Sequence, residues 1–143
     1  MADLVAFIGA KAQETLPDYY NAADVVVMPS DYESFGLVAL EAMACGRPVI
    51  ASEVGGLVYL VRHGETGLRV PRRQPVALAR ALDRLLRDEA LRQRMGENGR
   101  RWAQAFGWAT ITDRILELYR QVLESHRARP RPALCYGHWR ASV

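Results

Sequence analysis

The chain has 143 residues, of which 50% are hydrophobic and 24% charged, with a formal net charge of +3. This length and composition fit one domain with a buried core. They exclude a membrane-spanning helix, because no apolar run is long enough to cross a bilayer. The N-terminal residues lack the basic and then apolar segment of a secretory signal. Two cysteines, Cys45 and Cys135, form no disulfide framework, which favours a cytoplasmic protein in a reducing compartment.

The net charge hides a strong asymmetry between the two parts of the chain. Residues 1–60 carry two basic and eight acidic side chains, whereas residues 61–143 carry seventeen arginines and eight acidic side chains. A basic half can indicate a nucleic-acid partner, whose binding would depend steeply on salt. Here acidic residues are interspersed and no aromatic residues interleave, so we interpret the arginines as solvated helix faces and expect no nucleic acid.

Short apolar runs alternate with helical patterns in the first half of the chain. The pattern predicts strands at residues 4–8, 25–28, 49–51 and 67–70, and helices at residues 14–23, 37–45 and 57–62. Gly46 and Pro48 supply the end signals for the helix at 37–45. Strands that alternate with helices indicate right-handed βαβ units and a parallel sheet. The sequence therefore predicts an α/β fold with a partial Rossmann-like sheet of about four strands.

The second half of the chain is predicted to be helical from Pro75 to about His126. Gly96 and Gly107 interrupt this run, so we expect three helices rather than one. Residues 127–143 contain two prolines, mixed charge and no periodicity, which is typical of a disordered tail. The predicted organisation is one domain at residues 1–126 followed by this tail.

Two carboxylates, Glu33 and Glu41, lie eight positions apart and flank an apolar run that begins after Gly36. A helix starting near Gly36 would direct its unpaired N–H groups and positive dipole end toward the Glu33 loop, which suits a phosphate or a developing anion. Glu41 would lie inside that helix among apolar residues, where a carboxylate is costly unless it is hydrogen-bonded. A ligand hydroxyl is one candidate partner.

This segment resembles the E-x7-E motif of the retaining GT-B-fold "group 1" glycosyltransferases, which include glycogen synthases, sucrose-phosphate synthases and inositol-phosphate glycosyltransferases. The spacing alone is a weak signal, but further blocks match in the same order. They are YNAADVVVMPS at residues 20–30, EAMACGRPVIAS at 41–52, GG at 55–56 and HGETG at 63–67. The likeness covers most of the chain and makes the match specific.

The resemblance implies roles for both glutamates. Glu33 matches the residue beside the donor sugar, which contacts sugar hydroxyls and the positive charge that develops at the anomeric carbon; the alternative is a carboxylate that caps a helix. Glu41 matches the residue that accepts hydrogen bonds from the ribose hydroxyls; its alternative is an ion pair with Arg47 or with a missing segment. The loop whose backbone N–H groups meet the sugar and diphosphate corresponds to Phe35, Gly36 and Leu37.

Two other segments correspond to parts of the donor site. Gly9 to Lys11 follow the first strand, where relatives hold the nucleobase of a UDP-, GDP- or ADP-linked sugar through backbone groups. Gly55 and Gly56 mark a tight loop near the cleft between domains. Many relatives have Pro-Glu one residue after this pair, whereas this chain has Val58-Tyr59, which leaves the identity of the sugar open. No metal-ligand spacing is found, and no cofactor beyond the donor is expected.

The resemblance implies transfer of a hexosyl group from a nucleotide diphosphate sugar to an acceptor hydroxyl, through an oxocarbenium-like transition state. The likeness begins at what would be the third strand of a six-stranded domain. The paired Arg and Lys that bind the diphosphate in relatives are not found, nor is the N-terminal acceptor domain. We therefore interpret the chain as a truncated GT-B C-terminal domain that is inactive alone. Peripheral membrane association of the full enzyme stays open.

Other functions compete with this one. The chain could be a non-catalytic nucleotide-sugar-binding or assembly module whose helical half docks on a partner, or a sugar-nucleotide epimerase of the same architecture. The truncation also predicts that the strand at residues 4–8 has lost its neighbour. It should either pair beside residues 25–28 or detach and expose an apolar edge that promotes self-association.

Overall fold

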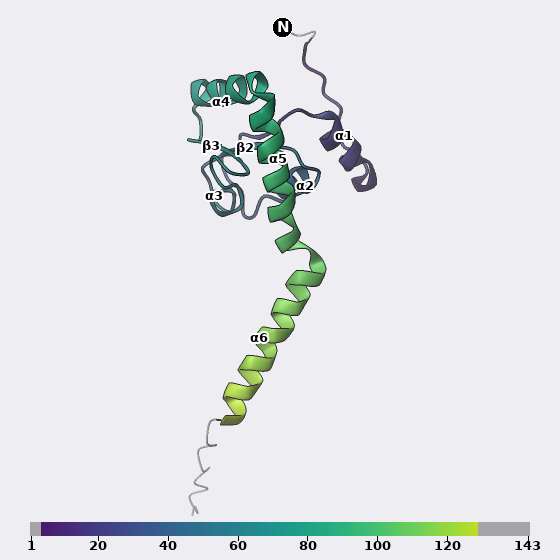
Figure 1. Ribbon diagram of the computed structural model, residues 1–143, viewed down its shortest axis with the longest axis vertical. Coiled ribbons are helices and arrows are strands. Elements are labelled where there is room, and N and C mark those ends of the chain that lie inside the picture. The colour runs from purple at the N-terminus through teal and green to yellow at the C-terminus, as the bar shows by residue number, and fades with distance from the viewer. Residues whose placement is uncertain (1–3, 129–143) are drawn as a thin grey trace, which may run out of the picture. The chain divides into compact units, whose positions relative to one another are not determined.

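The computed structural model describes residues 4–128, and the chain divides after Gly107 into two compact units, Met1–Gly107 and Trp108–Val143. The first unit contains a parallel sheet of three strands, β1 (Val26–Met28), β2 (Val49–Ser52) and β3 (Gly67–Val70), in the order β1-β2-β3 (Figure 1). In the register of the sheet, Val26 of β1 pairs with Val49 of β2, and Val49 pairs with Gly67 of β3. The predicted α/β class with a parallel sheet is confirmed.

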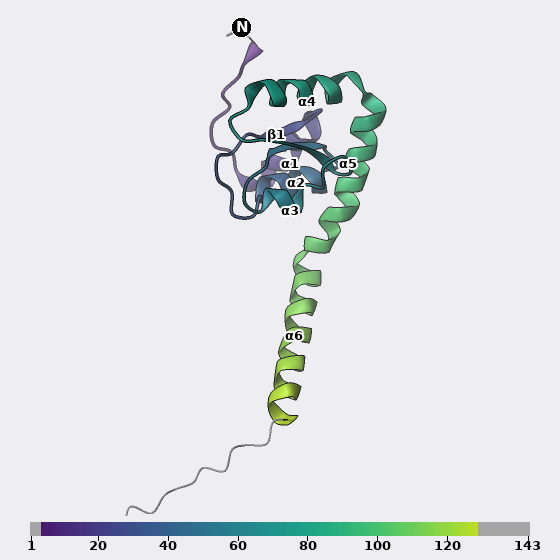
Figure 2. The same cartoon turned by 90° about the vertical axis from the view of Figure 1, so that its left-hand side faces the viewer.

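Helices cover both faces of this sheet. They are α1 (Leu16–Ala22), preceded by the 3₁₀ turn η2 (Gln13–Thr15), then α2 (Leu37–Ala44), α3 (Leu57–Leu60), α4 (Pro75–Arg87), α5 (Glu89–Ala103) and η3 (Gln104–Phe106). Figure 2 shows α4 on one face of the sheet and α2 and α3 on the other. Each of the helices predicted before residue 63 is present, with ends that differ by at most two residues.

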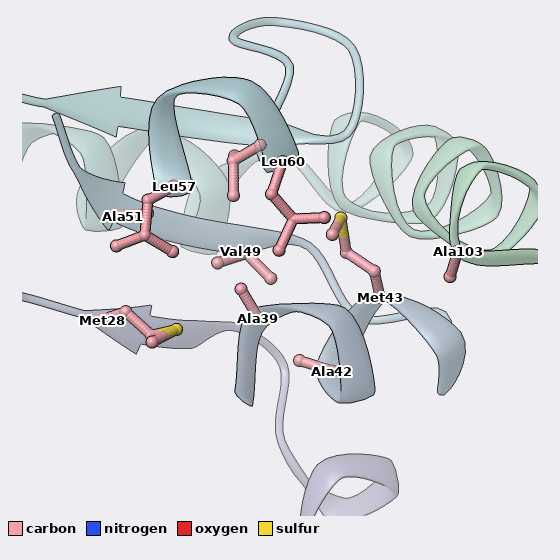
Figure 3. Packing of buried hydrophobic residues seen from close by; sticks show 10 residues of the cluster. Met28, Ala39, Ala42, Met43, Val49, Ala51, Leu57, Leu60 and Ala103 are labelled. Carbon is pink, nitrogen blue, oxygen red and sulfur yellow. The ribbon is translucent and has the colours of Figure 1, made fainter. Parts of the chain in front are cut away.

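The alternation of side chains along β2 divides the core into two layers. Val49 and Ala51 contribute to the layer beneath α2 and α3, whereas Ile50 contributes to the layer beneath α4. All four residues of β2 are buried, as expected for the central strand of a parallel sheet that is covered on both faces. The first layer is shown in Figure 3 and contains Met28, Ala39, Ala42, Met43, Val49, Ala51, Leu57, Leu60, Val61 and Ala103.

The predicted strand at residues 4–8 is wrong. This segment forms no strand, and its large side chains are exposed, with Leu4 at 87% and Phe7 at 98%. A short apolar run does not become a strand without a neighbour to complete its backbone hydrogen bonds. Of the two predicted alternatives, the structure shows the detached one, and within residues 4–128 only one edge of β1 is paired. Self-association stays a prediction.

The predicted helix break at Gly96 is also wrong. The chain instead breaks at Asp88, whose carboxylate Oδ1 accepts the Leu91 N–H at 2.8 Å and caps α5. Gly96 lies inside α5, where a Cβ atom would collide with the Gly46 carbonyl oxygen. Gly96 therefore permits close packing of α5 on the turn after α2 rather than ending a helix. The predicted break at Gly107 is confirmed, because α6 begins at Trp108.

The second unit is described by the single helix α6 (Trp108–Ala128). Arg127 and Ala128 belong to this helix, so the predicted tail begins two residues too early. The rest of the predicted tail lies outside the described residues, as does Cys135. Among the helices that are described, none combines the length and apolarity that a bilayer crossing requires.

Candidate functional site

The Glu33 side chain lies in the loop between β1 and α2 and folds back on the start of that helix. Its Oε1 atom accepts the backbone N–H groups of Phe35 at 3.4 Å and Gly36 at 3.2 Å. Gly36 has a φ of +98°, a backbone conformation that glycine adopts without strain. Glu33 therefore does cap the helix start, as one of the two hypotheses proposed. Its Oε2 atom makes no hydrogen bond within the described part of the chain.

The first turn of α2 offers backbone donors beside this carboxylate. Glu33 Oε1 engages the N–H groups just before the helix, but within residues 4–128 no side chain accepts from the N–H of Leu37, which is 64% exposed at the first helical position. The first N–H groups of a helix have no partner within the helix, and they lie at the positive end of its dipole. The arrangement can therefore bind an anionic group at the position that the sequence predicted.

Gly55 and Gly56 fix the position of the Glu33 loop. The Gly56 N–H donates to the Glu33 carbonyl oxygen at 3.1 Å. A Cβ atom at Gly55 would overlap the same carbonyl, and one at Gly56 would lie 2.6 Å from the Phe35 Cα atom. Glycine is thus required at both positions for the two loops to touch. The pair forms the predicted tight loop, and its place near a cleft between domains stays a prediction.

A pocket of about 970 Å³ opens between these loops. Its lining residues are Tyr32, Glu33, Ser34, Phe35, Gly55, Gly56, Val58, Tyr59, Leu60, Trp102 and Phe106. One wall is aromatic, with the Phe106 ring edge-on to Phe35 at 5.9 Å and to Trp102 at 5.1 Å between ring centroids. The lining includes no lysine or arginine, so this wall supplies no cation for a phosphate.

This aromatic wall was not predicted from the sequence. Trp102 and Phe106 come from the end of α5 and from η3, far along the chain from Phe35. The Trp102 Nε1 atom donates to the Leu60 carbonyl at 3.0 Å, and the Arg62 guanidinium stacks 3.6 Å from the ring centroid. No periodicity links these residues, so only their positions in the fold reveal the pocket.

Glu41 is half-buried in α2 and has a partner that the sequence did not indicate. The Tyr20 hydroxyl, from α1, donates to Glu41 Oε2 at 2.7 Å. Burial raises the pKa of Tyr20 above its ordinary value, and the hydrogen bond to the Glu41 carboxylate raises it further. Within residues 4–128, no ion pair joins Glu41 to Arg47. The alternative in which Arg47 neutralises Glu41 is therefore not supported.

Within residues 4–128, no hydrogen bond or ion pair joins Gly9 or Lys11 to the Glu33 loop. The Lys11 ammonium lies 6.0 Å from the centroid of the Tyr19 ring. Gly9 has a φ of +65°, and an added Cβ would meet nothing within 4 Å. Their role at the nucleobase stays a prediction. Among the described residues, no group of three or more His, Cys, Asp or Glu side chains could hold a metal ion.

An exposed ion pair joins the loops that follow β1 and β3. The Arg73 Nη2 atom lies 2.6 Å from Asp31 Oδ2, and Arg73 Nε donates to both carboxylate oxygens. The hydrogen bond from Arg73 lowers the pKa of Asp31 below its ordinary value. Arg73 has a φ of +57°, which is uncommon for a residue other than glycine. This pair ties the loop that leads to Glu33 to the loop after β3, the strand at the opposite edge of the sheet.

Comparison with known proteins gives a consistent match. A family model described as "Glycosyl transferases group 1" matches residues 1–102. The chain is 46% identical to the D-inositol 3-phosphate glycosyltransferase of Streptomyces avermitilis over 131 residues. That match covers 92% of this chain but 28% of the relative. The chain thus spans less than a third of the length of the curated relatives that it matches.

Solved structures agree with this match. The sucrose-phosphate synthase from Thermosynechococcus elongatus is 52% identical with a TM-score of 0.80, covering 86% of this chain and 31% of that chain. The structure of Anabaena Alr3699/HepE in complex with UDP-glucose is 33% identical with a TM-score of 0.75. That match covers 82% of this chain and 32% of the Anabaena chain.

Proposed function

Because the chain belongs to the group 1 glycosyl transferases, we propose that it forms the donor-binding part of a retaining glycosyltransferase. The reaction is transfer of a hexosyl group from a nucleotide diphosphate sugar to an acceptor hydroxyl. One observation carries this proposal above the others. The Glu33 carboxylate is held against the N-terminus of α2 with one oxygen bonded to backbone N–H groups, at the wall of a pocket large enough for a sugar.

Glu33 contributes to catalysis through its charge and its fixed position. Two backbone bonds hold Oε1, so Oε2 is presented without the loss of side-chain entropy that a mobile glutamate would suffer. A carboxylate that contacts the hydroxyls of the donor sugar favours the positive charge that develops at the anomeric carbon. Fixed charges of this kind stabilise the transition state without reorganisation during the reaction. Glu33 acts as this electrostatic residue.

The leaving diphosphate is stabilised by the first turn of α2. The segment Phe35, Gly36 and Leu37 meets the sugar and diphosphate. Because the Phe35 and Gly36 N–H groups already donate to Glu33 Oε1, the donors to the diphosphate are the N–H groups of the first turn that begin with Leu37, where the helix dipole favours negative charge. Phe35 contributes through its backbone, whose N–H holds Glu33 Oε1, while its ring packs in a T-shaped arrangement against Phe106. Glu41 accepts hydrogen bonds from the ribose hydroxyls, and Gly9 to Lys11 contact the nucleobase.

The relatives described above are named as glycosyltransferases or a synthase, which favours this function over an epimerase or an assembly module. The protein from Anabaena was solved with UDP-glucose, which makes that donor the first to test. The wall of the pocket has no cation to neutralise a diphosphate. We therefore expect binding of UDP-glucose to this chain in the millimolar range, about −4 kcal/mol.

The proposal is tested by nuclear magnetic resonance titration of the whole chain with UDP-glucose and with UDP. Glu33→Gln should weaken the binding of UDP-glucose about threefold or more, because a hydrogen bond to a charged group is lost. The same variant should leave the affinity for UDP nearly unchanged, because Glu33 contacts the sugar. Glu97→Gln is the matched control, since Glu97 is exposed on α5 and does not line the pocket.

Resonances of the Glu33 loop and the first turn of α2 should shift most during the titration. If UDP-glucose causes no shifts at ten times the expected dissociation constant, donor binding by this chain is refuted. Titrations with GDP-glucose and ADP-glucose identify the base. Radiolabelled donor with a panel of acceptors tests transfer directly, and we expect no product from the chain alone.

A further inference from the structure

Tyr20 is tied to Glu41 across two helices that lie side by side. The phenolic oxygen is 2.7 Å from Glu41 Oε2, although the two residues are 21 positions apart in the chain. The Tyr20 ring also packs against the buried layer that includes Ala42 and Met43, so its direction is fixed by the core. Burial and the nearby carboxylate both raise the pKa of Tyr20, so the phenol stays protonated and remains a donor at neutral pH.

This bond determines which oxygen of the Glu41 carboxylate can accept a hydrogen bond from a ligand. A carboxylate has about four lone-pair sites on its two oxygens, and the Tyr20 hydroxyl engages Oε2. Within the described residues no hydrogen bond reaches Oε1, and that oxygen is left to accept from a ligand. A glutamate held by a second side chain loses less conformational entropy when it binds a hydroxyl than one that turns freely.

We propose that Tyr20 is a positioning residue, which holds the Glu41 carboxylate so that it recognises the ribose hydroxyls of the donor nucleotide. The inference rests on the proposed function, because it deepens the description of the same donor site. Tyr20 does not touch the donor; it acts through Glu41. A tyrosine with a merely structural role would affect the binding of every nucleotide equally when altered. A positioning residue should affect only the part of the affinity that depends on the ribose hydroxyls.

The test compares UDP with 2′,3′-dideoxy-UDP in nuclear magnetic resonance titrations of the full chain. The wild-type chain should bind UDP more tightly than the dideoxy nucleotide, by about threefold to tenfold for one or two lost hydrogen bonds. Tyr20→Phe should reduce this ratio to near one by weakening UDP alone. Tyr19→Phe is the matched control, because Tyr19 is the adjacent residue of α1 and keeps its ring beside Lys11.

Glu41→Gln provides a second variant and a second measurement that needs no ligand. Replacing the carboxylate should lower the pKa of the Tyr20 phenol, which can be followed through the ring-carbon resonance of labelled tyrosine. Glu41→Gln should also remove the preference for ribose. If Tyr20 titrates alike in the wild-type chain and in Glu41→Gln, the bond between them is absent in solution and the inference is overturned.

The outcomes separate this inference from the proposed function. If Tyr20→Phe keeps the full wild-type preference for UDP over the dideoxy nucleotide, the positioning role is wrong while donor binding stands. Equal affinity of the wild-type chain for the two nucleotides also overturns the positioning role, because Glu41 then does not bind the ribose hydroxyls. If neither UDP nor UDP-glucose binds the wild-type chain, the proposed function fails and this inference fails with it.

Discussion

Gly56→Ala should destabilise the first unit, although alanine is ordinarily tolerated in that backbone conformation. Gly56 has φ −64° and ψ −23°, which any residue adopts without strain. The added Cβ atom would lie 2.6 Å from the Phe35 Cα and 2.8 Å from the Phe35 carbonyl oxygen, closer than real Cβ atoms approach. The Ser34 carbonyl oxygen lies nearer still, and all of these obstacles are backbone atoms, so no side chain can turn away to make room.

The expected loss of stability follows from three contributions. Overpacking of this kind costs about 1–3 kcal/mol. Separation of the loops would also weaken the bond from the Gly56 N–H to the Glu33 carbonyl, at about 1 kcal/mol. Alanine lowers the conformational entropy of the unfolded chain relative to glycine, which stabilises the folded state by about 0.4–1 kcal/mol. The net destabilisation is therefore about 2 kcal/mol.

Urea unfolding followed by tryptophan fluorescence measures this loss, with Trp102 as the probe inside the first unit. With a slope of about 2 kcal/mol per molar urea, the midpoint should fall by about 1 M. Gly107→Ala is the matched control. Gly107 has a φ of −62°, and the nearest atom to an added Cβ is the Gln104 carbonyl oxygen at an ordinary 3.5 Å.

Gly107→Ala should unfold at the wild-type midpoint or slightly above it, because it gains the same restriction of the unfolded chain without a clash. If the two variants unfold at the same urea concentration, contact between the loops does not determine the need for glycine at position 56. Gly56→Ala should also weaken the binding of UDP-glucose, because it displaces Glu33.

Three further predictions concern stability. The folded-state pKa of Tyr20 is raised above its value of 10.0 in the unfolded chain, so its contribution to the free energy of unfolding is complete below pH 10 and is lost as the pH rises toward the folded pKa. Tyr20→Phe should remove this part of the loss of stability at alkaline pH. Urea midpoints between pH 9 and pH 11 would show the difference. Asp88→Ala removes the cap of α5 and should cost about 1 kcal/mol in urea unfolding, whereas Asp88→Asn should cost less; equal losses would contradict the capping role. Met43→Ala should cost about 2–5 kcal/mol because Met43 is fully buried, and a loss below 1 kcal/mol in calorimetry would contradict the packing shown in Figure 3.

Local sequence signals were sufficient to predict most helices and strands and the part of the site formed by the Glu33 loop and the start of α2. β-branched residues before Pro29 define β1, and Gly46 with a φ of +73° ends α2 where the pattern predicted. Glu33 lies next to the helix that it caps, so four residues of sequence, from Glu33 to Gly36, contain the whole interaction. Such features depend on neighbours in the chain, which is why spacing and residue type predict them.

The sequence by itself determined the alternation of strands and helices, the α/β class, the family likeness and the helix start after Gly36, because these depend on patterns within short segments of the chain. The tertiary structure alone decided that residues 4–8 form no strand and that Gly96 sits inside a helix against Gly46. It also decided that Tyr20 holds Glu41, across 21 positions. A strand needs a partner, a helical glycine can serve close packing, and a buried carboxylate takes a donor from wherever the fold brings one.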